Sequence, residues 1–177
     1  MKKLFVTFCL LITMIAIASG QSSREWIKYT SLAGRYSVSL PGEPKLSTQE
    51  ATSADGQKFP QYLASVVDAG NMAYMTGYFD SLPGTIFSLD AARDGVIRQI
   101  KGTLLDDTVV KLSGYAAREF KISATGEDGN IYLVRARFCE IDKRVYLLQF
   151  IVPKSIESKT VTAQGTRYFD SFQVVKN

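Results

Sequence analysis

The chain has 177 residues, of which 46% are hydrophobic and 21% charged, and its formal net charge is +4. This composition is that of a folded globular protein and argues against intrinsic disorder, collagen-like repeats and a disulfide scaffold. The sequence contains no histidine. That absence excludes hydrolases and proteases that use a histidine base, histidine-ligated zinc and haem held by a proximal histidine.

The first twenty residues have the pattern of an export signal. Two lysines near the start are followed by an apolar run over Leu4–Ala18, and small residues surround Gly20. The run is shorter than the roughly 20 residues of a membrane-spanning helix, so a retained anchor is the less favoured alternative. We expect residues 1–20 to be a signal peptide cleaved between Gly20 and Gln21. The mature protein would then lie outside the cytoplasm, periplasmic or secreted, with no stable membrane span.

Cleavage would leave residues 21–177, a length typical of a single domain. Two lysines leave with the signal, so 19 cationic side chains remain against 17 acidic ones and the net charge falls to +2. A nucleic-acid partner is not expected, since that function calls for clustered positive charge. Cys139 becomes the single cysteine, and its apolar surroundings in the sequence favour a buried thiol over a reactive or intermolecularly paired one.

The first part of the mature chain predicts antiparallel strands. Apolar and polar residues alternate from Tyr36 to Leu40, which is the pattern of a half-buried strand. Turn signals such as Pro41-Gly42 and Asp55-Gly56 separate the segments. The expected strands are Trp26–Tyr29, Arg35–Leu40, Phe59–Val67 and Met72–Phe79, with Lys45–Thr52 as a polar strand or loop.

A change of period then predicts a helix. Apolar residues recur at three- and four-residue spacing from Leu89 to Leu104, with Ser88 as a suitable N-cap and Gly102 as a C-terminal stop. A second helix is expected over Ser155–Asp170, although a glycine in its interior costs roughly 1 kcal/mol relative to alanine. The remaining expected strands are Thr108–Leu112, Tyr115–Thr125, Ile131–Ile141, Val145–Val152 and Phe172–Val175.

The hairpin near residue 143 indicates how the sheet is covered. If Glu140 pairs with Val145, then Arg137 lies beside Leu148 and both faces of the hairpin are partly apolar. Such a sheet needs cover on both sides. The order of elements therefore predicts an α+β fold, a mainly antiparallel sheet with helices packed against it.

Four local patterns resemble the PsbP-like family and together span nearly the whole mature chain. They are Tyr36-Ser37-Val38-Ser39-Leu40-Pro41-Gly42-Glu43-Pro44, Gly114 with Arg118-Glu119, Arg144-Val145-Tyr146-Leu147-Leu148, and Tyr168-Phe169-Asp170-Ser171-Phe172. The resemblance implies an α/β/α sandwich, an antiparallel sheet between helices, and a non-enzymatic binding or assembly domain. Each pattern is a turn, a strand or a helix end, and none matches the metal-associated or photosystem-docking features of the plant branch. No functional residue is transferred from the family.

Three arginines form the candidate binding group. Arg135 and Arg137 lie two apart on one strand face, about 7 Å from each other. If Arg118 approaches from the preceding strand, the three could hold a carboxylate or phosphate. The alternative is that they pair with Glu119, Glu140 or a helix carboxylate, or that they line the partly solvated edge of the second layer.

Three functions follow from these features. The first is an exported binding or accessory module for a protein or cell-envelope partner. The second is a carrier of a small anionic ligand, held by the three arginines against Tyr or Phe walls. The third is a hydrolase that uses carboxylates alone, such as Asp80, Asp106 or Glu119. Asp106 and Asp107 are poorly placed to share a proton or a metal, because neighbours in an extended chain point to opposite sides, and a solvated loop pair is expected. No catalytic residue, metal ligand or cofactor is predicted.

Overall fold

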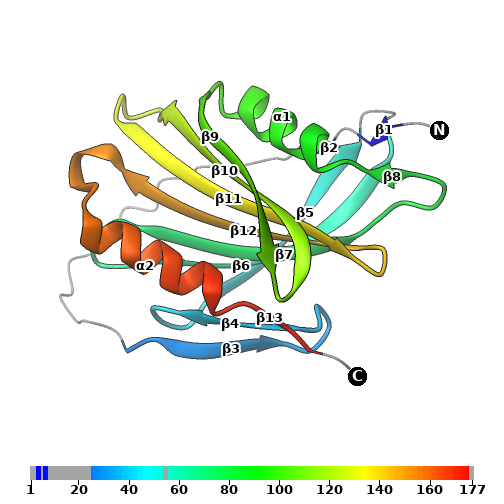
Figure 1. Ribbon diagram of the computed structural model, residues 1–177, viewed down its shortest axis with the longest axis horizontal. Coiled ribbons are helices and arrows are strands. Elements are labelled where there is room, and N and C mark those ends of the chain that lie inside the picture. Colours follow the sequence, from blue (N-terminus) through cyan, green and yellow to red (C-terminus); the bar gives the residue numbers. More distant parts are fainter. Residues whose placement is uncertain (1–2, 5, 8–24, 54–55, 176–177) are drawn as a thin grey trace.

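A computed structural model describes residues 3–4, 6–7, 25–53 and 56–175 (Figure 1). The strands of its main sheet are β2 (Val6–Thr7), β5 (Lys45–Ser53), β6 (Lys58–Val67), β7 (Ala73–Asp80), β9 (Thr103–Leu112), β10 (Tyr115–Thr125), β11 (Ile131–Ile141) and β12 (Arg144–Pro153). Their spatial order is β2-β5-β6-β7-β12-β11-β10-β9, and every neighbouring pair is antiparallel. The expected α+β fold built on a mainly antiparallel sheet is confirmed.

Smaller elements complete the fold. A three-stranded sheet has the order β13-β4-β3, and a short parallel pair joins β1 to β8. These elements and the helices are β1 (Lys3–Leu4), β3 (Ile27–Ser31), β4 (Tyr36–Leu40), β8 (Ile86–Phe87), α1 (Leu89–Gln99), the 3-10 helix η1 (Lys154–Ile156), α2 (Lys159–Asp170) and β13 (Gln173–Val174). The predicted cleavage point between Gly20 and Gln21 and the predicted turn residue Asp55 lie outside the described residues.

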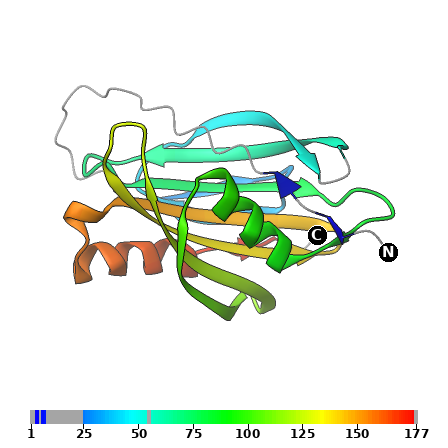
Figure 2. The same cartoon turned by 90° about the horizontal axis from the view of Figure 1, so that it is seen from above.

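Each face of the main sheet carries its own apolar core. On the α1 face, Ala92 and Val96 of the helix pack with Phe120 and other sheet residues. On the α2 face, Tyr168 of the helix and Tyr36 of the three-stranded sheet join a second core. Figure 1 shows α1 above the sheet and α2 with the three-stranded sheet below it, and in the view from above α1 lies nearest the reader (Figure 2). Because both faces are covered, β12 is buried along most of its length and does not alternate between buried and exposed residues.

The register of the β11–β12 hairpin agrees with the sequence prediction. Glu140 is opposite Val145, and Arg137 is opposite Leu148. The two turn residues, Asp142 and Lys143, both have positive φ values, 50° and 65°. A two-residue turn of this kind matches the twist of the strands that it joins, so it fixes the pairing that follows.

The first helix begins at the predicted N-cap and ends just before the predicted stop at Gly102. The Ser88 hydroxyl accepts a hydrogen bond from the backbone of Ala91 at 3.3 Å, which confirms the N-cap. The helix ends at Gln99, because Lys101 takes a left-handed conformation with φ 49° and the Gly102 amide bonds back to Ile97 at 2.9 Å. The predicted continuation of the apolar helix face to Leu104 is therefore wrong. The chain instead enters β9, and Asp106-Asp107 lies in a strand and not in a loop.

No helix in the described part of the chain is both long enough and apolar enough to cross a bilayer.

Candidate binding cleft

A cleft of about 270 Å³ lies between α2 and the strands β9–β12. Its floor is apolar and comes from the sheet, while the helix contributes one apolar and two hydroxyl side chains. The floor residues are Leu133, Phe150 and Val152, and the helix residues are Val161, Thr162 and Thr166. We call this site the α2 cleft.

Gly165 sets the distance between α2 and the sheet beside the cleft. A Cβ atom at this position would lie 2.6 Å from Cδ1 and 2.8 Å from Cε1 of Phe150, closer than real contacts allow. The helix therefore lies closer to Phe150 of β12 than a residue with a Cβ atom at position 165 would allow. The interior glycine that weakens the helix in isolation has a packing reason here.

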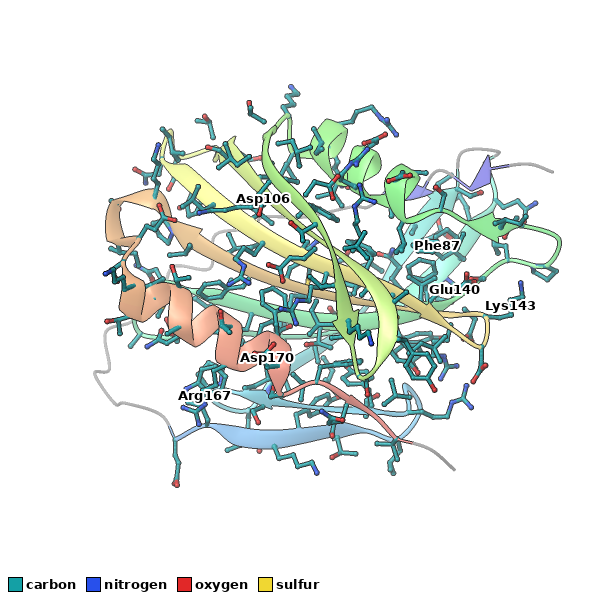
Figure 3. All side chains as sticks on the ribbon, in the orientation of Figure 1. Phe87, Asp106, Glu140, Lys143, Arg167 and Asp170 are labelled. Carbon is teal, nitrogen blue, oxygen red and sulfur yellow. The ribbon has the colours of Figure 1, made fainter. Side chains whose placement is uncertain are left out.

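Five charged side chains line the α2 cleft, and four of them are already paired. Lys121 meets Glu157 at 2.6 Å, and Arg135 meets Glu119 at 2.7 Å. The side-chain carboxylate of Asp106, on the edge strand β9, makes no hydrogen bond or salt bridge with any described residue. Figure 3 shows Asp106 along β9. Among the lining side chains, three carboxylates and two cationic groups give the cleft a formal charge of −1, and Asp106 is opposite Lys121 across the β9–β10 pair.

Glu119 holds two arginines on the α2 face, an arrangement that we call the Glu119 clamp. It accepts hydrogen bonds from Arg135 Nη2 and from Arg137 Nε. The two guanidinium carbons lie 5.0 and 4.8 Å from the ring centre of Phe169, and Arg137 also reaches Asp170 at 3.2 Å. Burial acts to raise the pKa of Glu119, but the two arginines outweigh it and the pKa is lowered. The carboxylate therefore stays ionised between the arginines at neutral pH.

The structure does not bring the three predicted arginines together. Arg135 and Arg137 share the α2 face, as predicted, but Arg118 is opposite Phe138 and lies on the α1 face. The reason is strand alternation: Glu119 is the residue that turns toward Arg137, so its neighbour must point the other way. The expected three-arginine cluster is corrected to a pair on one face and a single arginine on the other. A ligand-binding role for any of them stays a prediction.

On the α1 face, Arg118 belongs to an ionic network, the α1 network. Asp107 accepts hydrogen bonds from Arg118, at 2.7 Å for Nη2, and from Arg93 of α1. Asp94 accepts from Arg93 at 2.8 Å, and Asp90 lies 3.3 Å from Arg118. The network ties α1 to the edge of the sheet.

We expect this network to make the protein sensitive to acid. Hydrogen bonds from Arg118, partly opposed by burial and reinforced by Arg93, lower the pKa of Asp107 from 3.8 to about 2. Because the pKa is lower in the folded state, the stabilisation is complete above about pH 4 and is lost as the pH falls through about 2. Asp107→Asn should therefore lower the free energy of unfolding by about 1–2 kcal/mol at pH 7. Urea unfolding should show this gap narrowing as the pH approaches 2, and a gap that does not depend on pH would contradict the assignment.

Cys139 and the three candidate acids can also be placed in the structure. The thiol of Cys139 is buried, as predicted, and burial raises its pKa to about 11. Asp80, one of the candidate acids, is held by Arg144 at 2.7 Å beside the β11–β12 turn, whereas Asp106 and Glu119 both line the α2 cleft. Among the described residues no three cysteines or carboxylates are grouped closely enough to hold a metal ion.

No family model and no curated protein matches the sequence. Comparison of structures is more informative. The solution structure of cyanobacterial PsbP (CyanoP) from Synechocystis matches with a TM-score of 0.59 and 11% identity, over 90% of this chain and 98% of that protein. The fold is PsbP-like. A crystal structure from Bacteroides thetaiotaomicron matches with a TM-score of 0.51 and 16% identity, over 85% of this chain. The chain spans only about half, 48%, of that second protein.

The structure shows what one pattern noted in the sequence does, Tyr168-Phe169-Asp170-Ser171-Phe172. The Tyr168 hydroxyl meets the Thr76 hydroxyl at 2.5 Å and donates to the carbonyl of Met75 at 2.6 Å, so it anchors α2 to β7. Phe169 lies under the arginines of the Glu119 clamp, and Asp170 binds Arg137. Figure 3 shows Asp170 at the end of α2. These contacts position the helix wall of the α2 cleft.

Two cleft features were not predicted from the sequence. The Lys121–Glu157 pair joins residues 36 positions apart, and the helix hydroxyls of Thr162 and Thr166 enter only because α2 packs on the sheet. One signal was present: Glu119 and Lys121 are two residues apart in a predicted strand and so share a face.

Proposed function

We propose that the chain is a PsbP-like accessory domain that acts outside the cytoplasm and binds a basic side chain of a protein partner in the α2 cleft. In this proposal residues 21–177 form one domain, released by cleavage after Gly20, and the domain catalyses no reaction. The resemblance of its sequence patterns to the PsbP-like family supports a binding or assembly role. The export pattern at residues 1–20 supports the location.

The observation that carries the proposal is the carboxylate of Asp106. It lines a cleft whose other four charged side chains are paired with one another, and the same cleft has an apolar floor. A lysine or arginine side chain would satisfy both features, since its aliphatic stem suits the floor and its charged end suits the carboxylate. Contacts of this kind, an apolar centre with a paired charge at the rim, are typical of interfaces between proteins.

The same geometry argues against a small anionic ligand at this site. Arg135 and Arg137 are the cations that such a ligand would need, but both already bind Glu119. An anion would have to displace a carboxylate that is part of the same chain. The free charge of the cleft has the opposite sign, which favours a cationic group.

Short peptides test the proposal without knowledge of the partner. Acetylated and amidated pentapeptides Gly-Ala-X-Ala-Gly, with X as lysine, arginine, glutamine or glutamate, are titrated into labelled protein and followed by amide chemical shifts. We expect the lysine and arginine peptides to shift amides around Leu133 and Thr166, and the other two to leave them unchanged. Asp106→Asn should weaken this binding about tenfold, since a charge-assisted hydrogen bond is lost. Asp142→Asn, in an exposed turn, is the matched control.

Equal responses to the lysine and glutamine peptides, or unchanged binding in Asp106→Asn, would contradict the proposed site. The export part is tested separately by the mass of the protein secreted from its host. A mature chain that begins at Gln21 is expected, and a protein that retains residues 1–20 outside the cytoplasm would contradict cleavage.

A further inference from the structure

β9 presents a free edge of the main sheet. It is the last strand in the order and pairs only with β10 among the described strands. Nine of its ten residues are at least partly exposed, and Val109 is 71% exposed. A strand edge of this length offers unpaired backbone groups to another strand. Natural proteins protect such edges with bulges, charged side chains or a covering partner.

The regular part of β9 is centred on Val109. Asp106 is opposite Lys121 and Leu104 is opposite Ile122, so Leu105 between them is bulged and has no partner. At the other end the strand stops at Leu112, before a turn. The regular segment therefore spans residues 106–112, and its middle residue is 109. Two identical segments related by a two-fold axis at that residue would pair along their whole length.

We propose that two copies of this chain associate by antiparallel pairing of β9 about Val109. In this register the exposed Val109 side chains of the two copies meet on the α1 face. Asp107 then lies opposite Lys111 of the partner subunit, and the reciprocal pair lies on the other side of the axis. Opposite charges that face each other across strands stabilise the pairing.

The charge of the α1 network supports this register. The network contains two arginines and three carboxylates, a formal charge of −1: Arg93, Arg118, Asp90, Asp94 and Asp107. Lys111 forms no salt bridge within the described part of its own chain, and it is exposed. Lys111 of the partner subunit would bring the network to neutrality, and the two-fold axis repeats this on both sides. A second copy is therefore the occupant that fits the edge, and the inference does not depend on the α2 cleft.

Disulfide trapping tests the register directly. Directly opposed residues have Cβ atoms about 4.5–5.5 Å apart, close to the spacing of a disulfide. The other cysteine of the sequence, Cys9, is first replaced by serine. In this Cys9→Ser background, Val109→Cys should form a covalent dimer under mild oxidation. Leu46→Cys, on β5 and 62% exposed, is the matched control and should remain largely monomeric. Buried Cys139 should not react.

Sedimentation over a concentration series tests the charges. The protein without added cysteines should show a dimer, and Lys111→Glu should raise its dissociation constant about tenfold or more, because two attractive pairs become repulsive. Thermal unfolding would show that both variants are folded. A monomer at every concentration, or a dimer that is unaffected by Lys111→Glu and not trapped by Val109→Cys, would overturn the proposal.

Discussion

Glu119→Gln is expected to lower the free energy of unfolding by about 2–3 kcal/mol at pH 7. The substitution keeps the shape of the side chain but removes the charge between Arg135 and Arg137, whose side chains are only 18% and 11% exposed. Two neighbouring cations would then be left close together over the Phe169 ring. Leaving a partly buried charge without its partner costs more than the pair itself contributes.

Urea unfolding at pH 7 measures the effect, with Glu127→Gln as the control. Glu127 lies exposed near the turn between β10 and β11, so its substitution should change stability by no more than about 0.5 kcal/mol. Because the pKa of Glu119 is lowered in the folded protein, the stabilisation from its charge should be lost as the pH falls below its ordinary range. Equal losses in the two variants would show that the Glu119 clamp contributes nothing.

Gly165→Ala should destabilise the protein by about 1–3 kcal/mol, against the ordinary preference of helices for alanine. The new Cβ would enter the space of the buried Phe150 ring, 2.6 Å from its nearest atom. Phe150 cannot move away easily because it is packed against Tyr74, 5.0 Å between ring centres. The helix would have to shift away from β12, which would also widen the α2 cleft.

Ala163→Gly in the same helix is the matched control. Ala163 is exposed, so this change should cost about 1 kcal/mol from helix propensity alone. Substitutions in opposite directions, glycine to alanine and alanine to glycine, are thus both expected to destabilise α2. A Phe150→Leu variant should reduce the cost of Gly165→Ala, since it makes room for the methyl group. A Gly165→Ala protein that is more stable than the original would contradict the close approach of helix and sheet.

Turn residues and helix caps predicted the elements whose boundaries depend on residues close in the sequence. The β11–β12 register could be predicted because a two-residue turn at Asp142-Lys143 leaves one natural pairing. The start of α1 could be predicted from Ser88 and its end from Gly102, but the apolar spacing alone continues to Leu104, beyond the point where the backbone at Lys101 has already reversed. Periodicity reports which side chains are buried, and a strand residue after the turn can be as apolar as a helix residue before it.

The candidate site was harder to predict because its parts come from distant segments. Arg135 and Arg137 were rightly placed on one face, but the residue that turns toward them from β10 is Glu119 and not Arg118. Moving one residue along β10 places Glu119 on the face where Arg118 was expected, so the arginines meet a carboxylate instead of a third cation. Asp106 was expected in a loop, and its place in the α2 cleft depends on β9 beginning at Thr103 and on the packing of α2.

Reversal of the charge at residue 106 is the most direct test of cation binding in the α2 cleft. The dissociation constants of the lysine and glutamate pentapeptides are measured for the original protein and for Asp106→Lys, with thermal unfolding as the check on folding. We expect the original protein to prefer the lysine peptide and Asp106→Lys to prefer the glutamate peptide. The same order of affinities in both folded proteins would contradict the assignment of the α2 cleft as the binding site.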